Sequence, residues 1–336
     1  MKKRKNGKVL FFLLVTGYWL LATFLSGCGP TYPKEEFAES IVRVCKKEYK
    51  IDVKVATVGK TVVIYAPLQE LWDPMFALTK RAGDELNDII LTVSRVSLST
   101  DADYNFYVVI AHDVRIPEIQ IIIVKSVLDV KRFMLNDISR GEFSKRMLID
   151  KRINPQAKKE HAIKEVFERM GLDKKWQDAV MNDFFRAQPA ALGDIGYWND
   201  KFYIKDISLP EFLAEQIAGR IKMEFYENKT LAGTITVKTA RGEYMAAAGK
   251  HYFQIGILAE SKVFGQSGSA EMTNTIFKTS IETAAHVLHG YNFEDYDYIE
   301  IIEEASAKSL KVTKAMLEDF RKKKITFDNI LSQSEN

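Results

Sequence analysis

Three side chains suited to metal binding or acid–base chemistry recur along one predicted helix, residues 270–289. Glu282, His286 and His289 are four and three residues apart, so a helix places all three on one face. Two imidazoles beside a carboxylate resemble part of a zinc site, which needs four ligands. No cluster of cysteine or histidine elsewhere in the sequence offers a fourth. We therefore predict a solvated helix face and no cofactor, and keep the three residues as candidate metal ligands.

A second pair, His112 and Asp113, follows a run of apolar residues that predicts a buried strand. Side chains at the end of a strand often line functional sites. A catalytic triad also needs a nucleophile, and the sequence assigns no serine or cysteine to this pair. The phosphate-binding pattern Gly-x-x-x-x-Gly-Lys and the hydrolase pattern Gly-x-Ser-x-Gly are absent from the chain. We predict no catalytic residue from these motifs.

The N-terminal segment, residues 1–27, has the pattern of an export signal. Five basic residues precede an apolar run over residues 9–25, and small residues follow it before Cys28. A membrane-spanning helix needs about 20 apolar residues, so this run is also compatible with an uncleaved anchor. Either interpretation places residues 29–336 outside the cytoplasm.

The sequence Leu25-Ser26-Gly27-Cys28 resembles the lipobox of bacterial lipoproteins. The resemblance implies cleavage between Gly27 and Cys28, a diacylglycerol on the Cys28 thiol, and usually an acylated amino group. Two or more acyl chains give stable membrane attachment. We therefore expect a lipid-anchored protein that faces the periplasm or the exterior. Gly29 replaces the aspartate that would imply inner-membrane retention, which favours the outer membrane in a host that has one.

The charge of the chain gives no indication of a nucleic-acid partner. The full sequence has 48 Lys and Arg against 45 Asp and Glu, a net charge of +3. Five of the basic residues and no acidic ones lie within residues 1–27, so the remainder carries 43 basic and 45 acidic residues. Because the basic excess belongs to the signal, we predict no nucleic-acid binding.

Only one cysteine remains if Cys28 carries lipid. Cys45 lies on the apolar face of the helix predicted over residues 34–49. A buried free cysteine behaves as a small hydrophobic residue. We predict that Cys45 is an inert core residue, with a reactive or intermolecular thiol as the alternative.

The order of sequence patterns predicts an α+β fold of two helix-on-sheet modules joined by a helical connector. In the first module, residues 34–144, the order is α-β-β-α-β-β-α, with Asp73-Pro74 starting the long central helix. The same order returns over residues 208–330, where Ser208 and Glu211 predict a capping box and residues 231–239 a strand. Sequence identity between the modules is low, which leaves duplication and two unrelated units both open.

Three further segments complete the predicted organisation. Residues 28–33 form a tether, residues 145–207 a connector with amphipathic helices near 156–170 and 174–188, and residues 331–336 a polar tail. With some 300 residues after the signal, the chain is long enough for two domains.

Part of the first module is similar to the peptidoglycan-binding domain of OmpA-like proteins. The similarity consists of an apolar strand at residues 62–64, Leu71-Trp72-Asp73, the long helix, residues 109–113 with His112-Asp113, and residues 136–140. An extra strand is expected at residues 117–124, where the family has a helix. The resemblance implies peptidoglycan binding.

These observations predict a lipid-anchored cell-envelope protein with a non-catalytic binding or envelope-assembly role. The expected partners are the membrane, through the N-terminal lipid, and an envelope protein or peptidoglycan. An envelope enzyme acting on wall or lipid substrates is the alternative, because catalytic residues can come from positions far apart in a sequence.

Overall fold

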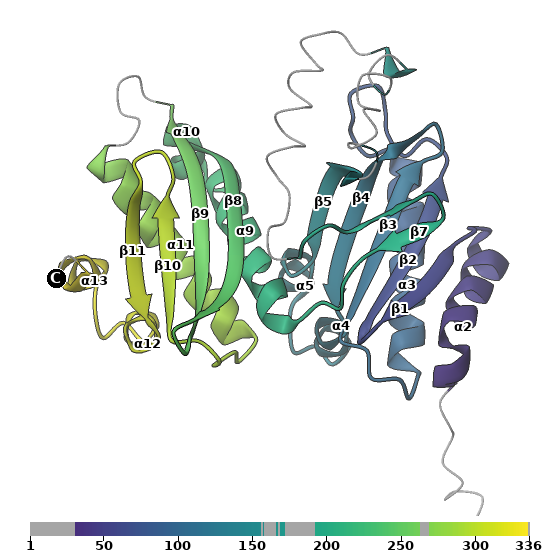
Figure 1. The fold of residues 1–336 in the computed structure, drawn as a ribbon, viewed down its shortest axis with the longest axis horizontal. Coiled ribbons are helices and arrows are strands. Elements are labelled where there is room, and N and C mark those ends of the chain that lie inside the picture. Colours follow the sequence, from purple (N-terminus) through teal and green to yellow (C-terminus); the bar gives the residue numbers. More distant parts are fainter. Residues whose placement is uncertain are drawn as a thin grey trace, which may run out of the picture.

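A computed structural model describes residues 31–155, 157, 166, 169–171, 192–262 and 269–334. Within these ranges the protein has the predicted α+β fold, with helices packed on sheets (Figure 1). The predicted signal, the lipidation site Cys28 and most of the two predicted connector helices lie outside the described residues. No helix in the described ranges is long and apolar enough to cross a membrane.

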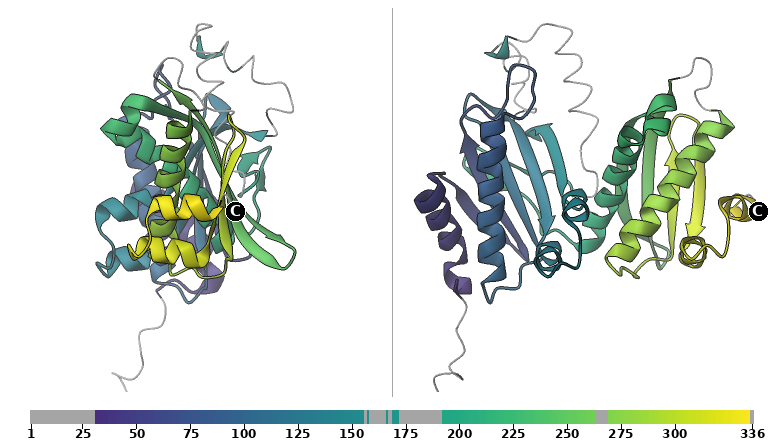
Figure 2. Two further views of the ribbon diagram at one scale, coloured as in Figure 1. Left: turned by 90° about the vertical axis from the view of Figure 1, so that its left-hand side faces the viewer. Right: turned by 180° about the vertical axis from the view of Figure 1, so that it is seen from behind.

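The first sheet has five strands in sequence order: β1 (Lys54–Val58), β2 (Thr61–Leu68), β3 (Phe106–Asp113), β4 (Ile116–Ser126) and β5 (Leu148–Ile153). The helix α3 (Lys80–Leu98) crosses from β2 to β3, so these two strands are parallel, whereas all other neighbours are antiparallel. Helices α2 (Phe37–Val44) and α3 cover one face of the sheet (Figure 2). Two short helices, α4 (Val127–Met134) and α5 (Arg140–Lys145), connect β4 to β5.

The second sheet has four strands: β8 (Ile235–Ala247), β9 (Lys250–Ser261), β10 (Tyr298–Glu303) and β11 (Lys308–Thr313). Their order and relative directions match those of β1 to β4. As in the first sheet, a long helix makes the one parallel connection: α11 (Ala270–Gly290) joins β9 to β10. The helix α9 (Leu209–Glu227) precedes this sheet, and α12 (Lys314–Arg321) and α13 (Phe327–Ser334) follow it. The two modules are therefore topologically equivalent, and matching positions can be compared.

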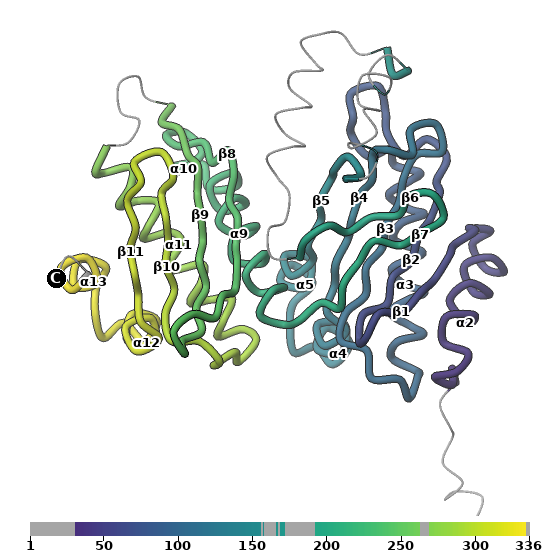
Figure 3. Tube along the Cα trace, viewed as in Figure 1, coloured from purple at the N-terminus to yellow at the C-terminus, as the bar shows by residue number. Residues whose placement is uncertain are grey.

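The two sheets share one hydrophobic core. The face of the first sheet opposite α3 packs against a hairpin of β6 (Gly196–Trp198) and β7 (Lys201–Tyr203), which crosses the sheet (Figure 3). The same core continues through α9, where the rings of Phe106 and Phe212 lie 5.0 Å apart, into the second sheet. Burial of apolar surface from both modules in one cluster stabilises them as a unit.

The capping box predicted at Ser208 and Glu211 is present at the start of α9, but the predicted start of α3 is wrong. Asp73 closes a turn by accepting two backbone N–H groups, including that of Ala77 at 2.8 Å. The helix begins at Lys80, seven residues after Asp73, and is capped by the Thr79 hydroxyl. An aspartate followed by proline fits both a turn and a helix start, and here the turn forms.

Two strand assignments also differ from the prediction. Residues 231–234, predicted as strand, belong to α10 (Lys229–Thr234), because the Asn228 side chain caps two of its backbone N–H groups. Residues 148–153, assigned to the connector, form β5 at the edge of the first sheet. Their charged and apolar residues alternate irregularly, so the sequence carries no clear strand pattern there.

Candidate functional site

The three candidate metal ligands lie exposed on one face of α11, as predicted, but they do not form a metal site. All three line a groove between α11 and α12, and Glu282 and His286 also face a polar cleft of about 390 Å³ between α5, α9 and α11. His286 Nε2 is 3.8 Å from Glu142 Oε2. Among the residues whose structure is described, no group of three His, Cys, Asp or Glu side chains is arranged to hold a metal ion.

His112 and Asp113 lie on opposite faces of β3, as consecutive strand residues do. His112 Nε2 is 2.8 Å from the Tyr65 hydroxyl, in the core shared with β6 and β7. Burial lowers the pKa of His112, so its ring is neutral near neutral pH. Asp113 instead accepts hydrogen bonds from Arg115, with Nη2 at 2.7 Å. The pair therefore shares no site.

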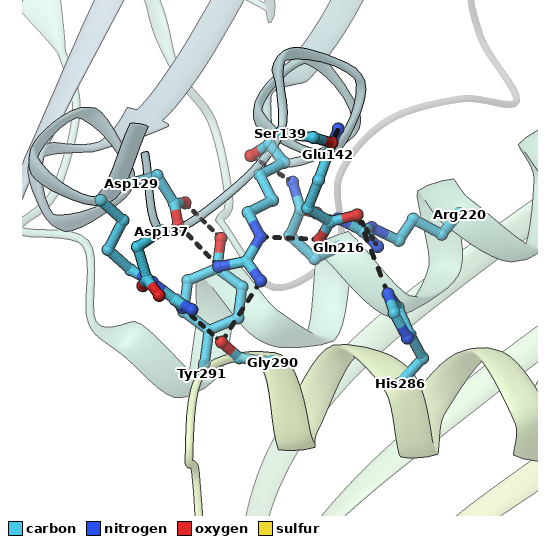
Figure 4. A network of polar contacts seen from close by, with 11 residues as sticks. Asp129, Asp137, Ser139, Glu142, Gln216, Arg220, His286, Gly290 and Tyr291 are labelled. Atoms are coloured by element: carbon cyan, nitrogen blue, oxygen red, sulfur yellow. Dashed lines mark hydrogen bonds and ion pairs between the residues drawn. The ribbon is translucent and has the colours of Figure 1, made fainter. Parts of the chain in front are cut away.

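A buried polar network joins the two modules where α4 and α5 meet α9 and α11 (Figure 4). Arg146, at the end of α5 and 3% exposed, donates to Asp129 at 2.8 Å and to Glu142 at 2.7 Å. The Tyr291 hydroxyl donates to the second oxygen of Asp129. Arg220 of α9 donates to Glu142 at 2.9 Å. Because these charges are paired with one another, the network acts as a structural joint between the modules.

The electrostatics of this joint depend on Glu142. Burial alone would raise the pKa of Glu142, but hydrogen bonds from Arg220 and Arg146 lower it to about 2. The carboxylate therefore stays ionised and bound to both guanidinium groups at neutral pH. It is not available as a general base.

A different region, between α3, α4 and α5, contains a cavity of about 670 Å³. Most of the surface of its described lining is apolar, and eight of its residues have apolar side chains: Ile90, Leu91, Leu98, Val130, Phe133, Met134, Phe143 and Met147. Its charged residues are all basic, namely Arg95, Lys125 and Arg140. A mainly apolar cavity with a few convergent polar groups is the usual form of a small-molecule site.

Lys125 is the least expected residue of this cavity, because it lies near the end of β4 and is only 2% exposed. Its Nζ is 3.1 Å from the centroid of the Phe143 ring, which stacks on Phe133. No carboxylate or hydrogen-bond acceptor contacts this ammonium in the part of the chain that the structure describes. The carboxyl group that influences it, that of Asp129, is bound by Arg146 and Tyr291.

Burial changes the electrostatics of Lys125. Burial lowers the pKa of Lys125 to about 8, and the attraction of Asp129 offsets this only in part. A buried cation normally requires a paired charge and hydrogen bonds. Lys125 is therefore a nearly buried cation that no carboxylate contacts within the described ranges.

The second module shows that the fold does not require a lysine at this position. Lys125 pairs with Tyr107 one residue before the helix cap, and Val312 of β11 pairs with Ile299 at the equivalent place. Val312 is fully buried in the core. An aliphatic side chain is thus sufficient for the architecture, and the lysine needs a separate explanation.

Sequence reasoning missed this site because Lys125 ends a run of buried residues and belongs to no motif. One signal was available: Ile119, Ile121 and Ile123 alternate toward one face of β4, and Lys125 continues that alternation inward.

Comparisons with known proteins add no family, since no family model, no curated protein and no solved structure matches this chain. The lipobox and OmpA-like resemblances stay predictions.

Proposed function

We propose that this protein is a lipid-anchored cell-envelope protein that binds an apolar molecule between α3, α4 and α5 without transforming it. The observation that supports this role is the apolar cavity with Lys125 buried in its wall. Its described lining contains no histidine, carboxylate or thiol to act as a general base or nucleophile beside that lysine. A lysine with a pKa of about 8 is itself suited to general-base catalysis, but none of the hydroxyl groups in the described lining is hydrogen-bonded to its ammonium, so we propose binding without catalysis.

The proposed anchor would hold this cavity close to a membrane. The backbone N–H of Tyr32 donates to the carbonyl oxygen of Ser99 at 3.1 Å, and Ser99 lines the cavity. Cys28 precedes Tyr32 by four residues, which span at most about 14 Å when fully extended. A lipid on Cys28 would therefore place the cavity within reach of the membrane surface.

The anchor is tested by intact mass after expression in a bacterium that processes lipoproteins. Wild type is expected to lose residues 1–27 and gain acyl mass, and Cys28→Ala is expected to show neither change. An unprocessed wild-type mass would contradict the anchor and support a membrane-spanning segment at residues 9–25.

The binding role is tested with a fluorescent apolar probe and the mature chain carrying Cys28→Ser, which removes the anchor. Ser144→Trp fills the edge of the cavity and is expected to reduce probe binding. Ser309→Trp introduces the same bulk on exposed β11 and serves as the matched control. Equal probe binding by both variants would refute binding in this cavity.

A further inference from the structure

We propose that the molecule bound between α3, α4 and α5 is a long-chain carboxylate, with its head beside Lys125 and its chain along the apolar walls. This inference rests on the proposed binding function and names the ligand class.

The sign of the charge in the cavity selects an anion. Arg95 pairs with Glu48 at 2.9 Å, which leaves Lys125 and the exposed Arg140 as cations without a carboxylate partner in the described ranges. No acidic residue is present in the described lining. The polar cleft between α5, α9 and α11 differs, since four glutamates line it together with Lys145, Arg220 and His286. A cationic amphiphile would be repelled by the first site and an anionic one attracted.

The number of buried charges favours a carboxylate over a phosphate monoester. Lys125 is the one cation of the described lining that is buried; Arg95 and Arg140 are exposed. A carboxylate neutralises one ammonium and accepts charge-assisted hydrogen bonds from it. A phosphate monoester carries almost two negative charges near neutral pH. Lys125 would neutralise one of them, and the other would be left in an apolar environment, which is unfavourable.

The size and the apolar lining of the cavity are compatible with an aliphatic chain. A volume of about 670 Å³ lies within the range that holds one small ligand. Leu91 is 52% exposed and Met134 is 63% exposed, and both line the cavity. These side chains continue the apolar wall to the surface, where a chain can enter from a membrane.

The test compares four ligands with the same twelve-carbon chain: dodecanoate, dodecanol, dodecyl phosphate and dodecyltrimethylammonium. Each displaces the fluorescent probe from the mature Cys28→Ser chain, with and without Lys125→Met. We expect dodecanoate to bind about ten- to a hundredfold more tightly than dodecanol, the range for a hydrogen bond to a charged group. Lys125→Met is expected to abolish that preference while dodecanol binding persists.

Several outcomes would overturn the proposed ligand class. Equal affinity for dodecanoate and dodecanol would do so, as would a preference that survives Lys125→Met or tighter binding of dodecyl phosphate. Each leaves the apolar binding function intact. Failure of all four ligands and of the probe would refute the binding function itself. The same ligand is also tested with the lipidated protein in nanodiscs. If this protein does not bind dodecanoate while the Cys28→Ser chain does, the cavity is occupied by the protein's own acyl chain. That result would also overturn the proposal.

Discussion

Replacing Lys125 with methionine is expected to stabilise the protein while it removes the preference for an anion. Burial lowers the pKa of this lysine from an ordinary value of 10.5 to about 8. At about 1.4 kcal/mol per pKa unit this corresponds to at most about 3 kcal/mol, because the cation–π contact of Nζ with the Phe143 ring offsets part of the cost. Methionine is flexible, apolar and similar in length, so it fills the same space without the charge.

The stabilisation is expected to depend on pH in a defined direction. Between pH 8 and pH 10.5 the unfolded chain keeps the Lys125 proton and the folded chain loses it, so wild type gains stability as pH rises. The advantage of Lys125→Met is therefore largest, at most about 3 kcal/mol, below pH 8, and it falls toward zero near pH 10.5. Other groups that titrate in this window do so in both proteins and cancel in the difference.

Urea unfolding of both proteins at pH 7, 8, 9 and 10 measures this difference, provided that the m-values agree. Lys131→Met, at an exposed position on the neighbouring helix α4, is the control and is expected to change stability by less than about 0.5 kcal/mol. A destabilised Lys125→Met, or an advantage that does not change with pH, would refute the conclusion that this ammonium is buried without a partner.

Three further predictions concern the rest of the fold. Arg146→Met leaves the buried Asp129 carboxylate without its cation and is expected to cost about 3–5 kcal/mol in urea unfolding; a cost below about 1 kcal/mol would contradict the structural joint. Gly242→Ala places a Cβ 2.0 Å from a backbone carbonyl oxygen of α9, and we expect its stability, measured by thermal unfolding, to fall by more than about 2 kcal/mol. In the control Gly233→Ala the new Cβ meets nothing within 4 Å, so its unfolding temperature should equal or exceed that of wild type. Burial raises the pKa of the Cys45 thiol to about 11, so a maleimide should label it only in denaturant; rapid labelling of the native protein would show an accessible thiolate.

The order of elements could be predicted because it depends on local periodicity. Apolar residues at helical spacing identify α3, and continuous apolar runs identify the buried strands β3 and β4. Ser208 and Glu211 satisfy each other within four residues, so their capping box also needs no tertiary information. The start of α3 was missed because Asp73 can satisfy the N–H groups of a turn or of a helix, and the sequence does not distinguish them.

The candidate sites were harder to predict because their chemistry depends on what surrounds each group. Glu282, His286 and His289 have suitable types and spacing, yet they face solvent. Arg146 and Asp129 are 17 residues apart and meet only through the packing of α4 and α5. Lys125 belongs to no motif, and its unusual property is that no carboxylate contacts it within the described ranges, which no spacing in a sequence reveals.

Comparison of the equivalent residues Lys125 and Val312 distinguishes what the fold requires at this position from what a ligand would require. Each residue lies at the end of a strand, one position before the residue that caps the following helix. In the second module this position is occupied by a fully buried valine. The lysine therefore costs stability, at most about 3 kcal/mol, that the same architecture avoids elsewhere in the chain. That cost is a large part of a typical stability of about 5–15 kcal/mol. A ligand that carries one negative charge would return much of this free energy on binding, because it supplies a charged partner that the described residues do not provide. Departures from local consistency of this kind are expected at functional positions, and Lys125 is such a departure.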